Sequence, residues 1–228
     1  METALPLRLN KFIAQATGMS RRAADDAIAQ RRVRINGQLV EQGTRVSPAD
    51  AVTLDGKPIQ LQAVQTILFN KPISYVVSRD GQGSKTIYDL LPSELHHLKP
   101  VGRLDKDSSG LLLLTNNGTL ADELTHPRNQ KTKQYQVTLD APLAPLHRQM
   151  ISDFGIQLTD GPSRLQLERI QDGDETQWIV TMHEGRNRQI RRTFEALGYA
   201  VTRLHRTHFG PYALSAIADG QFTSVKDN

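Results

Sequence analysis

The chain has 228 residues, of which 38% are hydrophobic and 23% charged, and its formal net charge is +4. This composition indicates a globular protein with a core, and no apolar run approaches the roughly 18–20 residues that cross a bilayer. The absence of cysteine excludes disulfides, thiolate zinc sites and cysteine nucleophiles, and no signal peptide pattern is visible, so we expect a cytoplasmic protein without membrane association.

The N-terminal part of the chain predicts a compact unit of helices followed by strands. Residues 7–31 predict two short helices, because apolar side chains recur at helical spacing, Gly18 interrupts the pattern and Ser20 is a suitable N-cap. The dipeptides Asn36-Gly37 and Asp55-Gly56 are hairpin turn signals. The strands expected around these turns cover residues 32–35, 39–40, 52–54 and 59–61.

The remainder of the chain predicts a larger second domain. We place the first domain at 1–63 and the second at 64–228, with a linker at 62–65. The second domain alternates strand and helix patterns with several short turns, so we expect an α+β fold with a mixed, mostly antiparallel sheet and flanking helices. The predicted strands are 67–69, 75–78, 110–115, 134–139, 165–170, 178–182, 201–206 and 222–225, and the predicted helices are 86–91, 119–124, 145–152 and 188–197.

Arginine and lysine are concentrated in two parts of the chain. The first group consists of Arg8, Lys11, Arg21, Arg22, Arg31, Arg32 and Arg34, and the second of Arg186, Arg188, Arg191, Arg192, Arg203 and Arg206. Two such patches on a basic chain favour a polyanion as partner, and nucleic acid is the commonest. The alternative is an ordinary solvated surface, with Arg21 and Arg22 paired to Asp25 and Asp26 four residues later. That alternative leaves the other basic residues of the first group without a local acid partner.

Three strings occur in a fixed order in the N-terminal unit: Arg8-Leu9-Asn10-Lys11-Phe12-Ile13, Ser20-Arg21-Arg22-Ala23-Ala24-Asp25 and Val33-Arg34-Ile35-Asn36-Gly37. In these strings the unit resembles the S4 RNA-binding domain. The resemblance implies that the two helices present a basic face to structured RNA, mainly to its phosphates. The RNA-binding residues it implies are Arg8, Lys11, Arg21, Arg22, Arg32 and Arg34.

A polar loop, residues 102–110, runs directly into four leucines at 111–114. A loop at the mouth of a buried strand holds its carboxylates, Asp105 and Asp107, near the core, where their pKa values can shift. An EF-hand-like calcium loop is disfavoured, because its later positions would be leucines and its final glutamate is missing. A two-carboxylate glycosidase lacks an evident partner acid. An ion pair between Arg103 and Asp105 is the remaining, purely structural interpretation.

Further strings follow along the second domain in a fixed order. They are Asn70-Lys71-Pro72, Gly102-Arg103-Leu104-Asp105, residues 109–116, His126-Pro127, Lys133-Gln134-Tyr135-Gln136-Val137, residues 184–192, Arg203-Leu204-His205-Arg206 and Gly210-Pro211. Together with the preceding S4-like unit, they resemble the motifs of the RsuA-type bacterial ribosomal RNA pseudouridine synthases. His126-Pro127-Arg128 and the arginine string look closer to the large-subunit (23S) members. One departure is Asn117, where the family often has Asp.

This resemblance implies an isomerase that converts a specific uridine of ribosomal RNA to pseudouridine. The reaction breaks the C1′–N1 bond and forms a C1′–C5 bond, which calls for a carboxylate, a flat side chain that stacks on the base, and a cation that keeps the carboxylate ionised and in place. The resemblance assigns these catalytic roles to Asp105, Tyr135 and Arg191, with Asp105 acting either as nucleophile at C1′ or as base at C2′. Because the target must be flipped from its stack, Arg103 would assist in extruding it. The other RNA-binding residues implied here are Arg186, Arg188 and Arg192.

The expected isomerisation needs no metal, nucleotide or redox cofactor, and the histidines show no ligand spacing, so we expect neither a metal site nor a cofactor. Ribosomal RNA is the expected partner. A monomer is expected, because no apolar stripe calls for a second subunit. Two other classes remain open: a non-catalytic S4-domain RNA-binding ribosome assembly factor, and a hydrolase that acts on glycosidic bonds.

Overall fold

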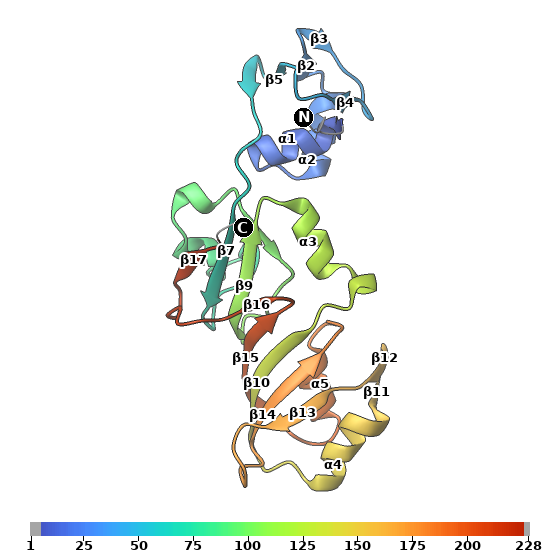
Figure 1. Cartoon of the computed structure of the whole chain (residues 1–228), viewed down its shortest axis with the longest axis vertical. Coiled ribbons are helices and arrows are strands. Elements are labelled where there is room, and N and C mark those ends of the chain that lie inside the picture. The colour runs from blue at the N-terminus through green and yellow to red at the C-terminus, as the bar shows by residue number, and fades with distance from the viewer. Residues whose placement is uncertain (1–5, 226–228) are drawn as a thin grey trace. The chain divides into compact units, whose positions relative to one another are not determined.

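The computed structural model describes residues 6–225. The chain divides into two compact units between Gln65 and Thr66 (Figure 1), which is two residues after the boundary expected from the sequence. None of the helices between residues 6 and 225 has the length and apolar character of a membrane span.

The first unit consists of two helices and short strands. The helices are α1 (Leu9–Thr17) and α2 (Arg21–Ala29), and the strands are β1 (Leu7–Arg8), β2 (Val33–Ile35), β3 (Gln38–Leu39), β4 (Arg45–Val46), β5 (Val52–Leu54) and β6 (Lys57–Ile59). β1 pairs with β4, and the other strands form a sheet in the order β3-β2-β5-β6. The helices pack on these strands through one apolar cluster that includes Ile13, Ile28 and Val52.

Local signals in the sequence account for the elements of this unit. α1 ends at Gly18, whose φ of 77° is left-handed, and the Ser20 side chain accepts the first-turn N–H of Ala23 at 3.0 Å. The predicted turns also form: Asn36 and Gly37 have φ of 51° and 81°, and Asp55 and Gly56 have φ of 52° and 76°. Positive φ at both central residues is the geometry that the right-handed twist of a tight hairpin requires.

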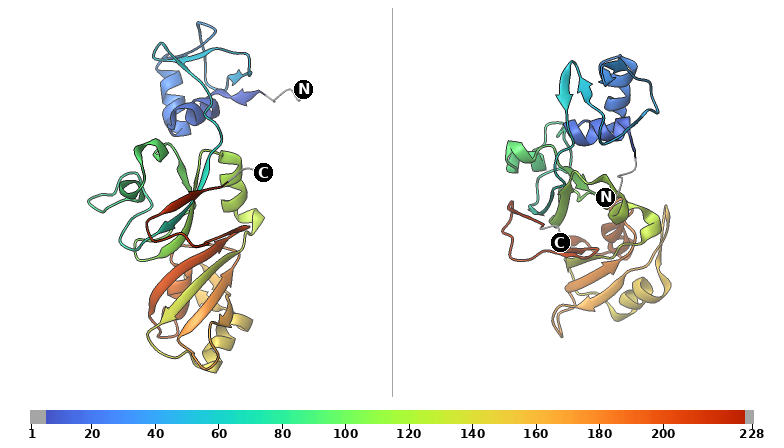
Figure 2. Two further views of the ribbon diagram at one scale, coloured as in Figure 1. Left: turned by 60° about the vertical axis from the view of Figure 1, so that its left-hand side comes forward. Right: turned by 45° about the horizontal axis from the view of Figure 1, so that its top comes forward.

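The second unit is built on one mixed sheet. Its strands are β7 (Thr66–Lys71), β8 (Lys99–Val101), β9 (Ser109–Thr115), β10 (Lys133–Leu139), β13 (Gln166–Arg169), β14 (Gln177–Met182), β15 (Val201–Phe209), β16 (Tyr212–Ala213) and β17 (Phe222–Ser224). The main order is β13-β14-β10-β15-β9-β7-β17, with β16 beside β15 and β8 beside β9. Among the strands of this sheet between residues 66 and 225, only β9 and β15 pair in parallel. The predicted mixed, mostly antiparallel sheet is therefore confirmed. Figure 2 shows β15 running between β9 and β10.

Helical segments and a small hairpin accompany this sheet. They are α3 (Gly118–Thr125), α4 (Pro145–Gln149), α5 (Gln189–Glu195), the 3₁₀ turns η1 (Ile87–Leu90), η2 (Ser93–Leu95) and η3 (Pro127–Asn129), the π-helical turn η4 (Met150–Phe154), and the hairpin β11 (Ile156–Leu158) with β12 (Gly161–Ser163). Asn117, the departure from the family pattern, caps α3 by accepting the N–H groups of Thr119 and Leu120. Because a short polar side chain with an acceptor oxygen suffices for an N-cap, Asn serves here as Asp would.

Three local predictions were wrong. The strand expected at 75–78 does not form, because Val76 has only a single bridge, to Thr86, and no neighbouring strand continues it. The helix expected at 86–91 is the 3₁₀ turn η1, closed by the carboxylate of Asp89 on the Thr86 N–H. The helix expected at 145–152 changes after Gln149 from α-helical to π-helical geometry.

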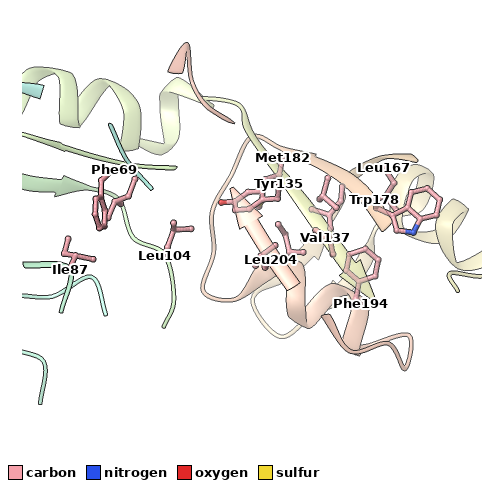
Figure 3. Packing of buried hydrophobic residues seen from close by; sticks show 14 of the residues in the cluster. Phe69, Ile87, Leu104, Tyr135, Val137, Leu167, Trp178, Met182, Phe194 and Leu204 are labelled. Carbon is pink, nitrogen blue, oxygen red and sulfur yellow. The ribbon is translucent and has the colours of Figure 1, made fainter. Parts of the chain in front are cut away.

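The leucine run at 111–114 is buried on both faces of the sheet. Leu112 and Leu114 belong to the larger apolar cluster, whereas Leu111 and Leu113 belong to a smaller one with Leu124 of α3. Alternate residues of a strand point to opposite faces, so a continuous apolar run fits a central strand that is covered on both sides. Figure 3 shows part of the larger cluster, including the apolar side chains around Tyr135. The loop before β9 is thus attached to one of the best-buried strands of the molecule.

Candidate active site

A cleft of about 1040 Å³ opens in the second unit. Its wall combines the loop before β9, the middle of β10, the start of α5 and the β11–β12 hairpin. Asp105, Tyr135 and Arg188 all line it, although they are far apart in the sequence. A concave site with a few converging polar groups is the usual form of a binding or catalytic centre.

Asp105 lies in the turn that leads into β9. The N–H of Ser108 donates to the Asp105 carbonyl at 3.1 Å, which closes the turn. The Asp105 side chain remains 38% exposed. The carboxylate therefore reaches the cleft from a backbone that is itself held by hydrogen bonds.

Lys71, at the end of β7, holds this turn through hydrogen bonds to its backbone. Its ammonium group donates to the carbonyl oxygens of Asp105 at 3.0 Å, Ser108 at 2.6 Å and Pro72 at 3.0 Å. The side chain is fully buried, and burial lowers the pKa of Lys71 to about 8, although the charges of Asp105 and Asp107 oppose the shift. The sequence reasoning gave Lys71 no such role. The available signal was a lysine at the end of an otherwise apolar strand.

The cation that pairs with the Asp105 carboxylate is not the one expected. Among residues 6–225, the side chain that forms an ion pair with Asp105 is Arg188, at 3.7 Å, and neither Arg191 nor Arg103 does so. Both terminal nitrogens of Arg188 also donate hydrogen bonds to the carboxylate of Asp107, at 3.1 and 3.0 Å. The assignment of Arg191 as the direct partner of Asp105 is corrected accordingly, and the structural interpretation of an Arg103–Asp105 pair does not hold.

Asp107 has a part in this site that the sequence resemblance did not assign to it. Besides Arg188, it contacts the Nε of Arg191 at 3.3 Å, and Arg191 also donates to the Asp107 carbonyl at 2.8 Å and to the Val201 carbonyl at 2.6 Å. Burial raises the pKa of Asp107, but the hydrogen bond from Arg188 and the charges of Arg191 and Arg188 outweigh it, so that this pKa lies below its usual value. Arg191 thus fastens the loop that carries Asp105, and it does so through Asp107.

Tyr135 lies in the middle of β10, opposite Val180 of β14 on one side and Arg206 of β15 on the other. It is only 8% exposed and packs in the larger apolar cluster, yet it lines the cleft. Figure 3 shows its ring close to Met182 and Leu204. A ring packed among apolar side chains of a sheet offers a rigid flat surface.

The arginines expected to bind RNA differ in whether they already form an ion pair with a carboxylate. Arg186 and Arg192 both pair with Asp160 at the tip of the β11–β12 hairpin, at 2.9 and 2.8 Å. Arg32, which has no local acid partner in the sequence, pairs with the distant Asp55 at 2.6 Å. Arg103 is exposed and lines the cleft.

The helices of the first unit carry the cations that are free of such pairs. Arg8, Arg21 and Arg22 are exposed, and Lys11 is half-buried. Within the described range of the chain, neither Arg21 nor Arg22 forms the ion pair considered for it, because Asp25 instead accepts two bonds from Asn10, at 3.0 and 3.1 Å. Arg34 is exposed and donates to the Gly37 carbonyl at 3.0 Å. Between residues 6 and 225, no group of His, Asp and Glu is placed to hold a metal ion.

This chain belongs to the RNA pseudouridylate synthase family, which its residues 65–196 match, and residues 7–52 match the S4 domain. It is 36% identical to an uncharacterized RNA pseudouridine synthase of Aquifex aeolicus, over 97% of this chain and 91% of that one. It is also 36% identical to the ribosomal large subunit pseudouridine synthase B of Bacillus subtilis, over 93% of this chain and 89% of the relative. A crystal structure of a pseudouridylate synthase superposes with a TM-score of 0.69 at 33% identity and covers 96% of both chains.

Proposed function

We propose that this protein converts a uridine of large-subunit ribosomal RNA to pseudouridine, with Asp105 as the catalytic carboxylate. The observation that carries the proposal is the position of Asp105: its side chain lines the cleft, pairs with Arg188 at 3.7 Å and shares the wall with Tyr135. The Bacillus subtilis relative, named for the large ribosomal subunit, supports the choice of RNA. This is the substrate that the sequence resemblance implies.

The side chains around Asp105 suit the reaction. In either possible first step, attack at C1′ or removal of the C2′ proton, the carboxylate must be ionised, and Arg188 and Arg191 supply positive charge around it. If Asp105 attacks C1′, its bond to C1′ forms as the C1′–N1 bond breaks, and that new bond breaks when C5 bonds to C1′. If Asp105 removes the C2′ proton, the proton returns to C2′ when C5 bonds to C1′. In both routes the uracil turns while stacked on Tyr135, N1 gains a proton and the proton on C5 leaves. Lys71 acts as a positioning residue, because it holds the backbone carbonyls of Asp105 and of Ser108, three residues later.

RNA would be held by both units. In this proposal the first unit contacts phosphates through Arg8, which precedes α1, Lys11 of α1, and Arg21 and Arg22 of α2. Arg103 reaches the nucleotide as it is flipped into the cleft. Arg186, Arg188 and Arg192, which are already paired to carboxylates, would meet RNA only by sharing those contacts. We propose action in the cytoplasm, as a monomer and without a cofactor.

The test is tritium release from ribosomal RNA that carries 5-tritiated uridine. Wild-type protein is expected to release tritium, and Asp105→Asn is expected to lose at least about a thousandfold in kcat, because the reacting carboxylate is gone. The affinity of the variant for RNA, measured by filter binding, is expected to stay within about threefold, since one exposed charge among many contacts changes.

Three outcomes would contradict the proposal. Turnover by a clean preparation of the Asp105→Asn variant would remove Asp105 from the chemistry. Release of free uracil would identify a hydrolase of glycosidic bonds. RNA binding by the wild type without any tritium release would identify a ribosome assembly factor.

A further inference from the structure

The rim of the cleft carries an aromatic ring that is exposed and does not pack in the core. Phe154 is 71% exposed, more than any other large apolar side chain between residues 6 and 225, and it lines the cleft. Burial is the usual fate of a phenylalanine, because its transfer out of water is favourable by a few kcal/mol at most sites. We therefore expect a ring that is exposed at the rim of a cleft to contact a bound ligand.

The backbone around Phe154 holds the ring out of the core. In a continuous α-helix, the residue three positions after the buried Ile151 would lie near the same face and be covered. The helix instead widens into the π-helical turn η4, closed by the bond from the Gly155 N–H to the Met150 carbonyl at 2.8 Å, which rotates Phe154 away from that face. Gly155 then turns the chain with a φ of 82°, where a Cβ would come within 3.3 Å of the Ser163 carbonyl oxygen.

A free cation accompanies this ring. Arg164 is exposed and also lines the cleft, and its Cβ lies 3.7 Å from the place a Cβ on Gly155 would take. Across the described part of the chain, its guanidinium has no hydrogen bond or ion pair, unlike Arg186 and Arg192, which are held by Asp160. The sequence reasoning selected the two held arginines and missed the free one.

We propose that Phe154 stacks on an unpaired base next to the flipped nucleotide while Arg164 binds a phosphate of the same strand. This inference rests on the proposed function, since it takes RNA as the occupant of the cleft. A ring beside a free guanidinium is the pairing that single-stranded RNA recognises, because every base has a flat face and every linkage a phosphate. Arginine and lysine outnumber the carboxylates of the cleft wall, Asp105 and Glu184, which favours a polyanion over an apolar partner.

The experiment compares Phe154→Ala, Phe154→Trp and Arg164→Gln with a matched control, Leu146→Ala. Leu146 is 64% exposed on the preceding helix α4, but it does not line the cleft. Fluorescence anisotropy with a labelled single-stranded RNA of mixed sequence gives Kd, and tritium release from ribosomal RNA gives kcat and KM. We expect Phe154→Ala to raise Kd and KM by about five- to hundredfold with kcat nearly unchanged, whereas Phe154→Trp stays near wild type. Arg164→Gln should lower the salt slope of binding by about one, and Leu146→Ala should change neither quantity.

The outcomes separate this inference from the proposed function. If Phe154→Ala binds RNA and turns it over like Leu146→Ala, the stacking role is overturned. If Phe154→Leu, which keeps an apolar side chain but has no ring, matches wild type, stacking is likewise overturned. If sedimentation shows that wild type is a dimer and Phe154→Ala a monomer, the ring covers a second copy and the inference fails. If wild type releases no tritium but Phe154→Ala still loses RNA affinity, the proposed function fails and the stacking role stands.

Discussion

At the scale of single residues, the position of Asp105 depends on groups that never touch its carboxylate. The ammonium of Lys71 reaches three carbonyl oxygens around the turn, two of them on Asp105 and Ser108. A fully buried charge is tolerated only when its hydrogen bonds are satisfied, and these three carbonyls satisfy all the donors of a lysine. The same bonds stiffen the loop, so removal of Lys71 is expected to affect both stability and turnover.

We predict that Lys71→Met lowers the free energy of unfolding at pH 7 by about 2–4 kcal/mol, because three buried carbonyls lose a charged donor. The loss should grow with pH. Burial depresses the pKa of Lys71 to about 8 in the folded protein from a usual 10.5, so above about pH 8 the unfolded chain binds the proton more tightly. The contribution of Lys71 to the free energy of unfolding therefore rises as the pH increases from about 8 to about 10.5, by on the order of 1–3 kcal/mol. It is lost again as the pH falls back through 8.

Urea unfolding of wild type and Lys71→Met at pH 7 and pH 10 measures this difference, and other lysines cancel between the two proteins. If the difference in free energy of unfolding between the two proteins narrows toward pH 10, the low pKa of Lys71 is contradicted. An unchanged difference would show that the Lys71 pKa is the same in the folded and unfolded states.

At the scale of elements, the parallel contact between β9 and β15 depends on one glycine. Gly110 lies opposite Arg206 in the register, with a φ of 103°. A Cβ at this position would lie 2.3 Å from the Arg206 carbonyl oxygen and 2.6 Å from its nitrogen, both fixed backbone atoms. Arg206 is itself buried and donates to the Leu111 carbonyl at 2.7 Å. The two strands can approach closely here only because no side chain intervenes.

We predict that Gly110→Ala destabilises the protein by about 3 kcal/mol or more, because it combines an unfavourable φ with a clash against backbone. Gly173→Ala is the matched control. Gly173 also has a positive φ, of 83°, but nothing lies within 4 Å of its added Cβ, so a loss of about 1 kcal/mol is expected. Thermal unfolding of both variants measures the difference. Equal losses would show that φ strain alone decides, and that the strands can separate to admit a methyl group.

Most strands and helices could be predicted from the sequence, because period and turn residues are local signals. The leucine run, the Asn36-Gly37 turn and the Ser20 cap are such signals. Residues 75–78 have the composition of a strand but lack a partner, which only the tertiary fold supplies. The π-helical turn η4 was equally unpredicted, because residues 145–152 carry one helical pattern that does not mark the change of helix type after Gln149.

The candidate site shows the same division. Asp105 and Tyr135 were identified from their motifs, and the structure brings both to one cleft. Arg188 precedes α5 as its N-cap, with a left-handed φ of 47°, whereas Arg191 lies in the first turn of the helix. Which arginine faces Asp105 therefore depends on the backbone at the start of α5, which the sequence alone did not predict. Arg164 escaped notice because it stands outside the arginine string.

At the scale of the whole molecule, the proposed RNA binding is divided between the two units, because each carries cations without a carboxylate partner among residues 6–225. In the first unit, Arg21 and Arg22 are exposed, and among residues 6–225 they form no ion pair, whereas Arg32 is held by Asp55 at 2.6 Å. Only a cation that releases counterions on meeting a phosphate contributes fully to the salt dependence of binding. An arginine that already has a carboxylate partner contributes less.

We predict that Arg21→Gln and Arg22→Gln each lower the salt slope of ribosomal RNA binding by about one and weaken binding with kcat unchanged, because α2 is remote in sequence from the catalytic loop. Arg32→Gln removes the same charge from the same unit and is expected to change the slope by clearly less than one. Filter binding over a series of KCl concentrations gives these slopes. If Arg21→Gln and Arg32→Gln change the salt slope equally, the distinction between unpaired and paired arginines is contradicted. A fall in kcat for Arg21→Gln or Arg22→Gln would contradict a role in RNA binding alone.

The place of β15 in the sheet has a consequence for synthesis of the protein. β15, at residues 201–209, lies between β9 and β10, and β10 with β14 and β13 has no other connection to β9 and β7 within the described sheet. A growing chain can therefore form two separate sheet fragments long before the central strand leaves the ribosome. Tyr135 on one fragment and Asp105 on the other would come to face one cleft only afterwards. In the proposed function, the active site would thus become competent only after β15 has been synthesised, and a product truncated before residue 201 would be inert.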